Sequence, residues 1–154
     1  MKYSVADREE NDRRVIRDIQ SHGCHVVSVF DPEELTPTFS YSIGLAESAN
    51  APDAIVIGLG PKLGLSLINR YCRKLMEGAQ FDRGVEYEGF LDDFPVLFEP
   101  LRHERHADYT LGCARHYKQR PYSVVQIIWP STTGVWPWQP QASAWLVANQ
   151  PMLG

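Results

Sequence analysis

Apolar residues recur at two different spacings along this chain, and the spacing predicts which segments are helices and which are strands. Residues 8–22, 61–77 and 106–120 carry apolar side chains three or four positions apart with polar residues between them, as expected for helices that bury one face. Short runs of β-branched or alternating apolar residues predict strands instead. These runs lie at residues 24–30, 38–45, 53–59, 95–101 and 122–129.

The first predicted helix has signals at both of its ends. Asp7 can accept a hydrogen bond from the first turn, and Glu10, three residues later, can return one to the backbone of Asp7. Gly23 stands where a helix commonly ends in a left-handed residue. The buried stripe of this helix is expected to consist of Val15, Ile16 and Ile19.

The first three predicted strands follow one another closely. In residues 38–45, Ser40 and Ser42 alternate with apolar residues, which is typical of a strand with one polar face. Residues 53–59 are almost continuously apolar, as expected of a strand covered on both faces. Because the connections are too short for crossover helices, the three strands are predicted to form an antiparallel meander.

The second half of the chain is less regular. Residues 79–95 mix glycine, acids and aromatics, and they predict an irregular excursion or a short hairpin. The third predicted helix ends before Pro121, because a proline restricts the residue that precedes it. Its inner face would hold Leu111, Ala114 and Tyr117.

The C-terminal residues 130–154 contain four prolines and three tryptophans. Such a segment cannot continue a strand ladder but can cover apolar surface, so it is predicted to be an extended tail over the body of a single domain, residues 1–154. The predicted fold class is α+β: a largely antiparallel, curved or partly closed sheet of five or six strands with about three helices packed on it.

Length, charge and cysteine content narrow the possible partners. The chain has 154 residues and a formal net charge of −4, which disfavours nucleic acid as a partner. Its three cysteines are far apart in the sequence and odd in number, which is typical of a protein from a reducing compartment. The N-terminal segment is charged, and no apolar run reaches the length of a membrane span. We expect a cytoplasmic protein without a membrane partner.

Three glycines between the predicted strand 53–59 and the helix that follows raise the possibility of a phosphate loop. Gly58, Gly60 and Gly64 miss the dinucleotide-binding spacing by one residue, so a structural turn is the favoured interpretation. The alternative is an anion bound by the free amides after Gly60 with help from Lys62.

Histidines and carboxylates give only weak signals of chemistry. His103 and His106 are three residues apart, whereas the helical zinc motif needs four, so no metal is predicted. The acids of residues 86–93 lie in a glycine-containing segment and are expected to be solvated. No serine or cysteine stands in a recognisable nucleophile motif.

A pocket next to residues 39–45 is the main binding hypothesis. His22 or His25, Tyr41 and Gln126 would converge there. Trp129 and Trp138 are added as candidate ligand-binding residues, because a tryptophan cluster either seals a core edge or forms a recognition surface.

Several motifs in this order resemble the bacterial domain-of-unknown-function family 4262. They are His22-Gly23 before an apolar strand, "FSYSIGL" at 39–45, "IVIGL" at 55–59, "LIN" in the following helix and "QIIWPSTTGVWPW" at 126–138. The chain departs from the family pattern at Cys24, Ser42 and Ser131, where tryptophan, threonine and aspartate are usual. The resemblance implies one compact cytoplasmic α+β domain, and it implies no activity or cofactor.

Two functions therefore remain open from the sequence. The first is a non-catalytic interaction or regulatory module with a protein partner, favoured by the missing catalytic motifs and the aromatic C-terminal segment. The second is a small-molecule-binding protein or enzyme that uses the pocket near residues 39–45. The cofactor and the oligomeric state stay undetermined.

Overall fold

The computed structural model describes residues 4–154, so residues 1–3 of the predicted domain lie outside the described part. In chain order the elements are α1 (Val5–His22), β1 (His25–Val29), β2 (Phe39–Ile43), α2 (Leu45–Ser48), β3 (Asp53–Ile57), α3 (Pro61–Met76), β4 (Leu97–Pro100), the 3₁₀ turn η1 (His103–Arg105), α4 (His106–Tyr109), α5 (Leu111–Tyr117), β5 (Val124–Ile128) and α6 (Ala144–Asn149).

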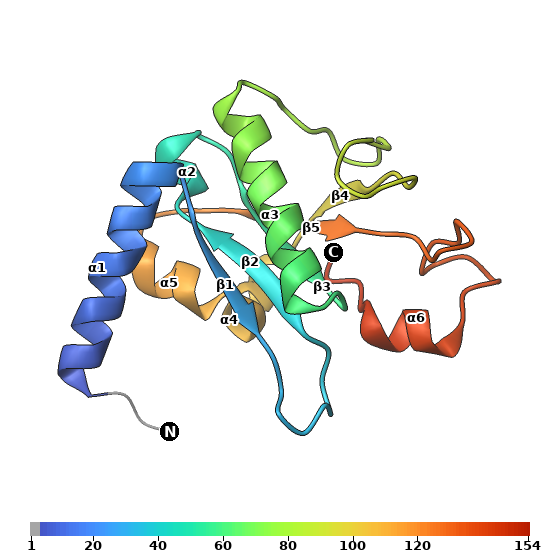
Figure 1. Ribbon diagram of the computed structural model, residues 1–154, viewed down its shortest axis with the longest axis horizontal. Helices are drawn as coiled ribbons and strands as arrows, with labels where there is room; N and C mark the ends of the chain where they lie inside the picture. The colour runs from blue at the N-terminus through green and yellow to red at the C-terminus, as the bar shows by residue number, and fades with distance from the viewer. Residues whose placement is uncertain (1–3) are drawn as a thin grey trace.

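The strands form one open, mixed sheet in the order β1-β2-β3-β5-β4 (Figure 1). β1, β2 and β3 make the predicted antiparallel meander, and β4 pairs antiparallel with β5 at the other edge. β3 and β5 run parallel, which the sequence pattern did not predict. The α+β class and the largely antiparallel sheet are confirmed, whereas a closed sheet is not, because β1 and β4 remain as edges.

Helices cover both faces of the sheet, with α3 in front of it and α4 and α5 behind it in the view of Figure 1. Ala54 and Val56 of β3 join the core on the α3 side, and Ile55 and Ile57 join the core on the α5 side. The continuous apolar run of β3 is thereby explained, since both of its faces are buried.

The polar face expected for β2 was a wrong interpretation of its serines. Ser40 and Ser42 are both fully buried. Ser40 shares a hydrogen bond with Ser28, and Ser42 donates one to Asp53. Hydroxyls with partners tolerate burial at little cost, so alternating serines here mark a core strand and not a solvated one.

The first helix begins one turn earlier than predicted. Ser4, not Asp7, is the N-cap, and Asp7 provides the return hydrogen bond of the capping box. The predicted end is confirmed, because Gly23 has a left-handed φ of 93° and its N–H bonds to the last turn. Val15 is buried as expected, but Ile16 is 46% exposed.

Two local predictions in the second half also needed correction. The predicted helix 106–120 is broken at Thr110 into α4 and α5, which leaves Leu111 65% exposed while Tyr117 is buried. In the first half of the chain, Leu45–Ser48, at the end of the predicted strand 38–45 and in the connection after it, form the short helix α2. The C-terminal segment 130–154 is not extended throughout, because Ser143 caps the short helix α6 by accepting from the Leu146 N–H.

Buried side chains fix the C-terminal segment against the sheet. Gln126 donates to the Pro151 carbonyl and accepts from the Leu153 N–H. Gln150 exchanges two hydrogen bonds with the backbone of Trp129. Within residues 4–154, none of the helices has the length and apolar character that crossing a membrane requires.

Candidate functional site

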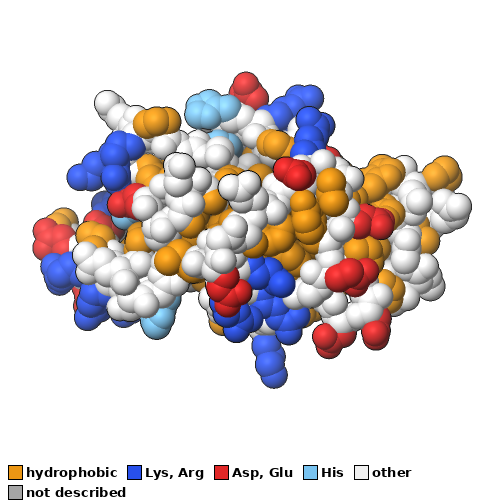
Figure 2. All heavy atoms as spheres, turned by 90° about the horizontal axis from the view of Figure 1, so that it is seen from above, with side chains coloured by type: hydrophobic (Ala, Val, Ile, Leu, Met, Phe, Trp, Pro, Cys, Tyr) orange, Lys and Arg blue, Asp and Glu red, His pale blue; other side chains and the backbone are white. Residues whose placement is uncertain are grey.

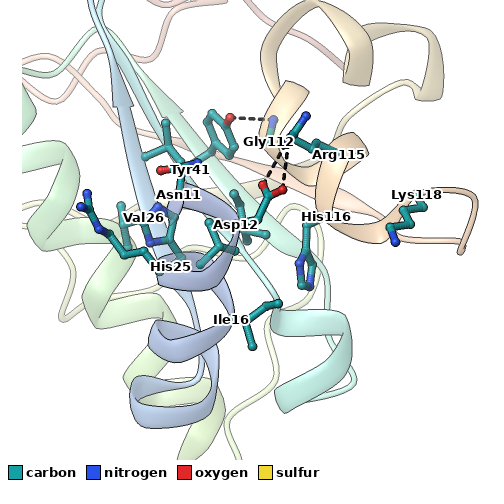
Figure 3. Close-up of a pocket in the computed structure, with 14 residues that line it drawn as sticks. Asn11, Asp12, Ile16, His25, Val26, Tyr41, Gly112, Arg115, His116 and Lys118 are labelled. Atoms are coloured by element: carbon teal, nitrogen blue, oxygen red, sulfur yellow. Dashed lines mark hydrogen bonds and ion pairs between the residues drawn. The ribbon is translucent and has the colours of Figure 1, made fainter. Parts of the chain in front are cut away.

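A cavity of about 520 Å³ lies between α1, the β1–β2 edge of the sheet and α5, and we call it the α1 pocket (Figure 3). α1 contributes Asn11, Asp12, Arg14, Val15 and Ile16; the strands contribute His25, Val26, Val27, Tyr41 and Ile43; and the α5 region contributes Gly112, Arg115, His116 and Lys118. The volume falls within the range of small-molecule sites, roughly 300–1,000 Å³.

One wall of the pocket is fixed by a contact between β2 and α5. The hydroxyl of Tyr41 accepts a hydrogen bond of 2.9 Å from the Gly112 N–H (Figure 3). A Cβ at Gly112 would lie 2.7 Å from that oxygen, so only glycine allows this approach. Burial raises the pKa of Tyr41 to about 12, and its phenol therefore stays protonated near neutral pH.

An ion pair joins α1 to α5 across the pocket. Arg115 donates two hydrogen bonds of 2.8 Å to the two carboxylate oxygens of Asp12. These hydrogen bonds hold the pKa of Asp12 below its usual value. The Arg115 and Asp12 side chains are 51% and 45% exposed, so a molecule entering from solvent can reach both.

Two histidines of the pocket are paired with carboxylates that lie outside its lining. His25 Nδ1 is 2.6 Å from Asp18 Oδ2, and His116 Nε2 contacts Glu47 Oε1. Each carboxylate orients its imidazole ring, which is a common arrangement for a histidine that contacts a ligand.

A buried carboxylate network lies behind the pocket wall. Asp53 is fully buried, and its oxygens accept hydrogen bonds from Ser42 Oγ at 2.8 Å, the Leu45 N–H at 3.2 Å and the Tyr117 hydroxyl at 2.6 Å. Tyr117 in turn accepts from the Gly44 N–H. The network therefore joins β2, the start of α2, β3 and α5.

The ionisation of Asp53 is opposed by its surroundings. Burial raises its pKa to about 6, although the hydrogen bonds from Tyr117 and Ser42 act in the opposite direction. Among the described residues, no lysine, arginine or histidine forms an ion pair with it. Its position in the network is that of a structural centre rather than a solvent-accessible acid.

The structure brings together only part of the predicted binding set. His25 and Tyr41 both line the α1 pocket. His22 is exposed at the end of α1 outside the lining, and Gln126 is buried on hydrogen bonds to the C-terminal segment. The predicted convergence of Gln126 with Tyr41 is therefore corrected, since both polar ends of the Gln126 amide are used by the backbone near the C-terminus.

The tryptophans have separate positions. Trp129 is buried, and its indole N–H donates to the Ile57 carbonyl at 2.8 Å. Trp136 packs in a small cluster with Leu97 and Ile128, whereas Trp138 stacks on Trp136 and stays 53% exposed. Trp129 therefore seals the core, and neither it nor Trp138 lines the α1 pocket.

The remaining candidate sites are the glycines after β3, the start of α3 and the histidines. Gly58, with φ 94°, lies against the carbonyl of Asn149, and Gly64 packs on Ser40. Gly60 is the N-cap of α3 and Lys62 is exposed beside it, so the anion prediction there remains a prediction. Within residues 4–154, no three His, Cys, Asp or Glu side chains come together as metal ligands would.

Comparison with known proteins identifies the family. The family described as Domain of unknown function (DUF4262) matches residues 18–143. The chain belongs to this family. The resemblance predicted from the sequence motifs is thus confirmed. No curated protein and no solved structure matches the chain.

The matched region of this DUF4262 domain contains one side of the α1 pocket. His25, Tyr41, Gly112 and Arg115 fall within residues 18–143. The residues that α1 contributes to the pocket, from Asn11 to Ile16, precede the matched region. The site is therefore completed by a helix that lies mostly outside the family match.

Sequence reasoning missed Asp12, Gly112 and Arg115. The two members of the ion pair are 103 positions apart, and each resembles an ordinary surface charge on its own helix. Gly112 stands second in α5, where a glycine has no helix-forming advantage, and this is the one local signal that a close approach is needed.

Proposed function

We propose that this DUF4262 protein is a small-molecule-binding module, and that the α1 pocket takes a small organic anion, a carboxylate or phosphate ester with an apolar part. The observation that carries the proposal is the pocket itself, an open cavity whose lining combines apolar residues with several basic side chains. The proposal follows the second hypothesis from the sequence, a pocket near residues 39–45.

The charges of the lining favour an anion. Arg14, Arg115 and Lys118 are basic, and Asp12 is the one acidic residue that lines the cavity in the described part of the chain. Arginine forms two parallel hydrogen bonds with a carboxylate or a phosphate, and Arg115 already makes this contact with Asp12. Asp12 thus occupies the position that the ligand anion would take.

Exchange of Asp12 for a ligand has a low energetic cost. An ion pair between solvent-exposed side chains adds little to stability, because water and salt screen it. A ligand that also buries its apolar part on Ile16, Val26 and Val27, the accessible apolar residues of the lining, gains roughly 25 cal/mol per Å² of apolar surface. The apolar contact therefore decides the competition in favour of the ligand.

The hydrogen bonds of the histidines support binding rather than covalent catalysis. His25 and His116 are each paired with a carboxylate, and no hydrogen bond in the described part of the chain joins either ring to a serine or cysteine. A nucleophile activated by histidine requires that contact.

The experiment compares three probes of similar size and different charge: phenylacetate, 2-phenylethanol and 2-phenylethylamine. Isothermal titration calorimetry gives the Kd of each. We expect phenylacetate to bind about tenfold more tightly than the other two, because it alone pairs with Arg115. Equal affinity for all three probes would contradict the anion assignment, and no measurable binding of any would contradict the pocket assignment.

Two variants test the geometry in opposite directions. Arg115→Gln should weaken phenylacetate binding about tenfold, whereas Asp12→Asn should tighten it because Arg115 loses its competitor. Arg105→Gln is the matched control, since Arg105 is also 51% exposed and paired with a carboxylate, that of Asp108. An equal loss in both arginine variants would show that the effect is only one of net charge.

A further inference from the structure

A second cavity, of about 330 Å³, lies at the C-terminal end of α3 and is lined by uncharged residues only; we call it the aromatic pocket. Tyr71, Phe81 and Phe98 form its aromatic wall, with Leu75, Ala79 and Val125 beside them. The rings of Phe81 and Phe98 stack with centroids 4.8 Å apart. The size is at the lower end for ligand sites and matches one large apolar side chain.

The segment that begins at this pocket carries the negative charge of the molecule. Residues 79–95 contain five carboxylates and one arginine, a net charge of −4 that equals the net charge of the whole chain. The rest of the protein is therefore electrically balanced. All five carboxylates, those of Asp82, Glu86, Glu88, Asp92 and Asp93, are exposed.

These carboxylates are not used to hold the fold together. Arg83, the basic residue of the segment, is paired with Glu99 on β4 at 2.6 Å. The segment is fixed through other groups, since Arg70 donates to the Phe90 carbonyl at 2.6 Å and the Lys74 ammonium lies over the Phe90 ring. Within residues 4–154, none of the five carboxylates takes part in an ion pair.

Figure 2 shows one face of the molecular surface. Apolar side chains line a depression near its centre, acidic side chains gather to one side of the depression, and Lys and Arg side chains lie at its lower edge. An uncharged pocket with an aromatic wall, next to a carboxylate-rich segment, is complementary to a chain segment that has one large apolar side chain between basic residues.

From this geometry we infer that the aromatic pocket is a docking site for a basic peptide segment of a partner protein. The partner inserts one phenylalanine, leucine or methionine side chain between Phe81, Leu75 and Val125. Lysine or arginine residues on either side of it face the carboxylates of residues 82–93. This surface is separate from the α1 pocket and does not depend on the proposed anion ligand.

The acidic border selects the class of partner. It repels the phosphates of nucleic acids and of anionic lipids, so neither is the occupant. It also attracts a basic segment from a distance, and the association should therefore weaken as salt screens the charges.

The test uses three acetylated, amidated pentapeptides as probes: one phenylalanine between two pairs of lysines, the same peptide with alanine in place of phenylalanine, and one phenylalanine between two pairs of glutamates. Binding to the full chain is followed by two-dimensional ¹⁵N NMR, with the amides of Gly78 and Ala79 as reporters. We expect the first peptide to shift these amides saturably and to bind at least about fivefold more tightly than either other peptide. Raising the salt from about 0.05 to about 0.5 M should weaken it by a similar factor.

Two variants separate the pocket from its border. Glu86→Gln combined with Glu88→Gln should weaken the lysine–phenylalanine peptide severalfold, whereas Glu9→Gln combined with Glu10→Gln, the same charge change on exposed residues of α1, should not. Ala79→Leu, which fills the pocket, should abolish the preference for phenylalanine over alanine. Equal affinity for the phenylalanine and alanine peptides in the wild type would overturn the pocket assignment. Equal loss in the two pairs of glutamate variants would overturn the role of the acidic border.

Discussion

Asp53 should make the stability of this protein depend on pH between about 4 and 6. Burial raises the pKa of this carboxyl to about 6 in the folded protein, against about 3.9 in an unfolded chain. The folded state therefore holds the proton more tightly. The stabilisation is complete below the unfolded pKa and is lost as the pH rises through the folded pKa.

The size of the effect follows from the difference between the two pKa values. About 2 pH units at about 1.4 kcal/mol each correspond to about 3 kcal/mol of unfolding free energy at pH values well below 3.9, of which about 2 kcal/mol is lost between pH 4 and pH 7. Asp53→Asn abolishes this titration. The variant also loses the acceptor of the Tyr117 hydroxyl, but that loss does not change with pH, because burial raises the pKa of Tyr117 far above this range.

Urea denaturation of the wild type and Asp53→Asn at several pH values measures the effect. The contributions of all other carboxylates are common to both proteins, so they cancel in the difference between the two unfolding free energies. We expect the wild type to lose about 2 kcal/mol relative to the variant as the pH rises from 4 to 7. A difference that stays constant would refute the raised pKa, and a difference of opposite sign would mean that the hydrogen bonds from Ser42, Leu45 and Tyr117 outweigh burial.

Three further predictions concern the fold. Gly44→Ala should lower the unfolding free energy by several kcal/mol in urea denaturation, because Gly44 has φ 109° and a Cβ there would lie 2.5 Å from Ile19; a loss under about 0.5 kcal/mol would contradict the packing. Trp136→Ala should destabilise the protein by about 3–5 kcal/mol and Trp138→Ala by much less, since only Trp136 is buried; equal melting temperatures would refute this. The Cys113 thiol, whose pKa burial raises, should resist alkylation until the protein unfolds, as mass spectrometry of the labelled peptide can check.

Helices and strands whose position depends on the local spacing of apolar residues could be predicted from the sequence. β1, β2 and β3 follow from β-branched and alternating residues, and α3 follows from its apolar stripe between Gly60 and Gly78. Elements that depend on contacts with distant parts of the chain could not be predicted. The start of α2 has no side-chain cap of its own, and its first N–H groups bond to Tyr117 and Asp53. No local sequence pattern predicts such a helix.

The residues of the candidate site likewise include some that the sequence could predict and some that it could not. Tyr41 and His25 could be proposed because each lies on a predicted strand near a motif, and both line the α1 pocket. Gln126 looked equally suitable from the sequence. Its side chain forms hydrogen bonds with the backbone of residues 151 and 153. These contacts depend on where the C-terminal segment returns to the sheet.

Asp53 shows why a buried acid is hard to recognise in a sequence. An aspartate that precedes an apolar strand resembles a turn residue, because aspartate is common in turns. Its burial follows from the parallel pairing of β3 with β5, which places Val124, 71 residues further along the chain, beside it. Sequence spacing alone does not predict that pairing.

The amide of Gly112 provides the most direct test of the α1 pocket. Its N–H bonds to the Tyr41 hydroxyl inside the cavity, so its ¹⁵N–¹H NMR signal should shift when a ligand enters. We predict a saturable shift of this signal on titration with phenylacetate, together with shifts in the Arg115 side chain, and little change with 2-phenylethylamine. A Gly112 signal that stays fixed while phenylacetate binds elsewhere on the protein would contradict the proposed function.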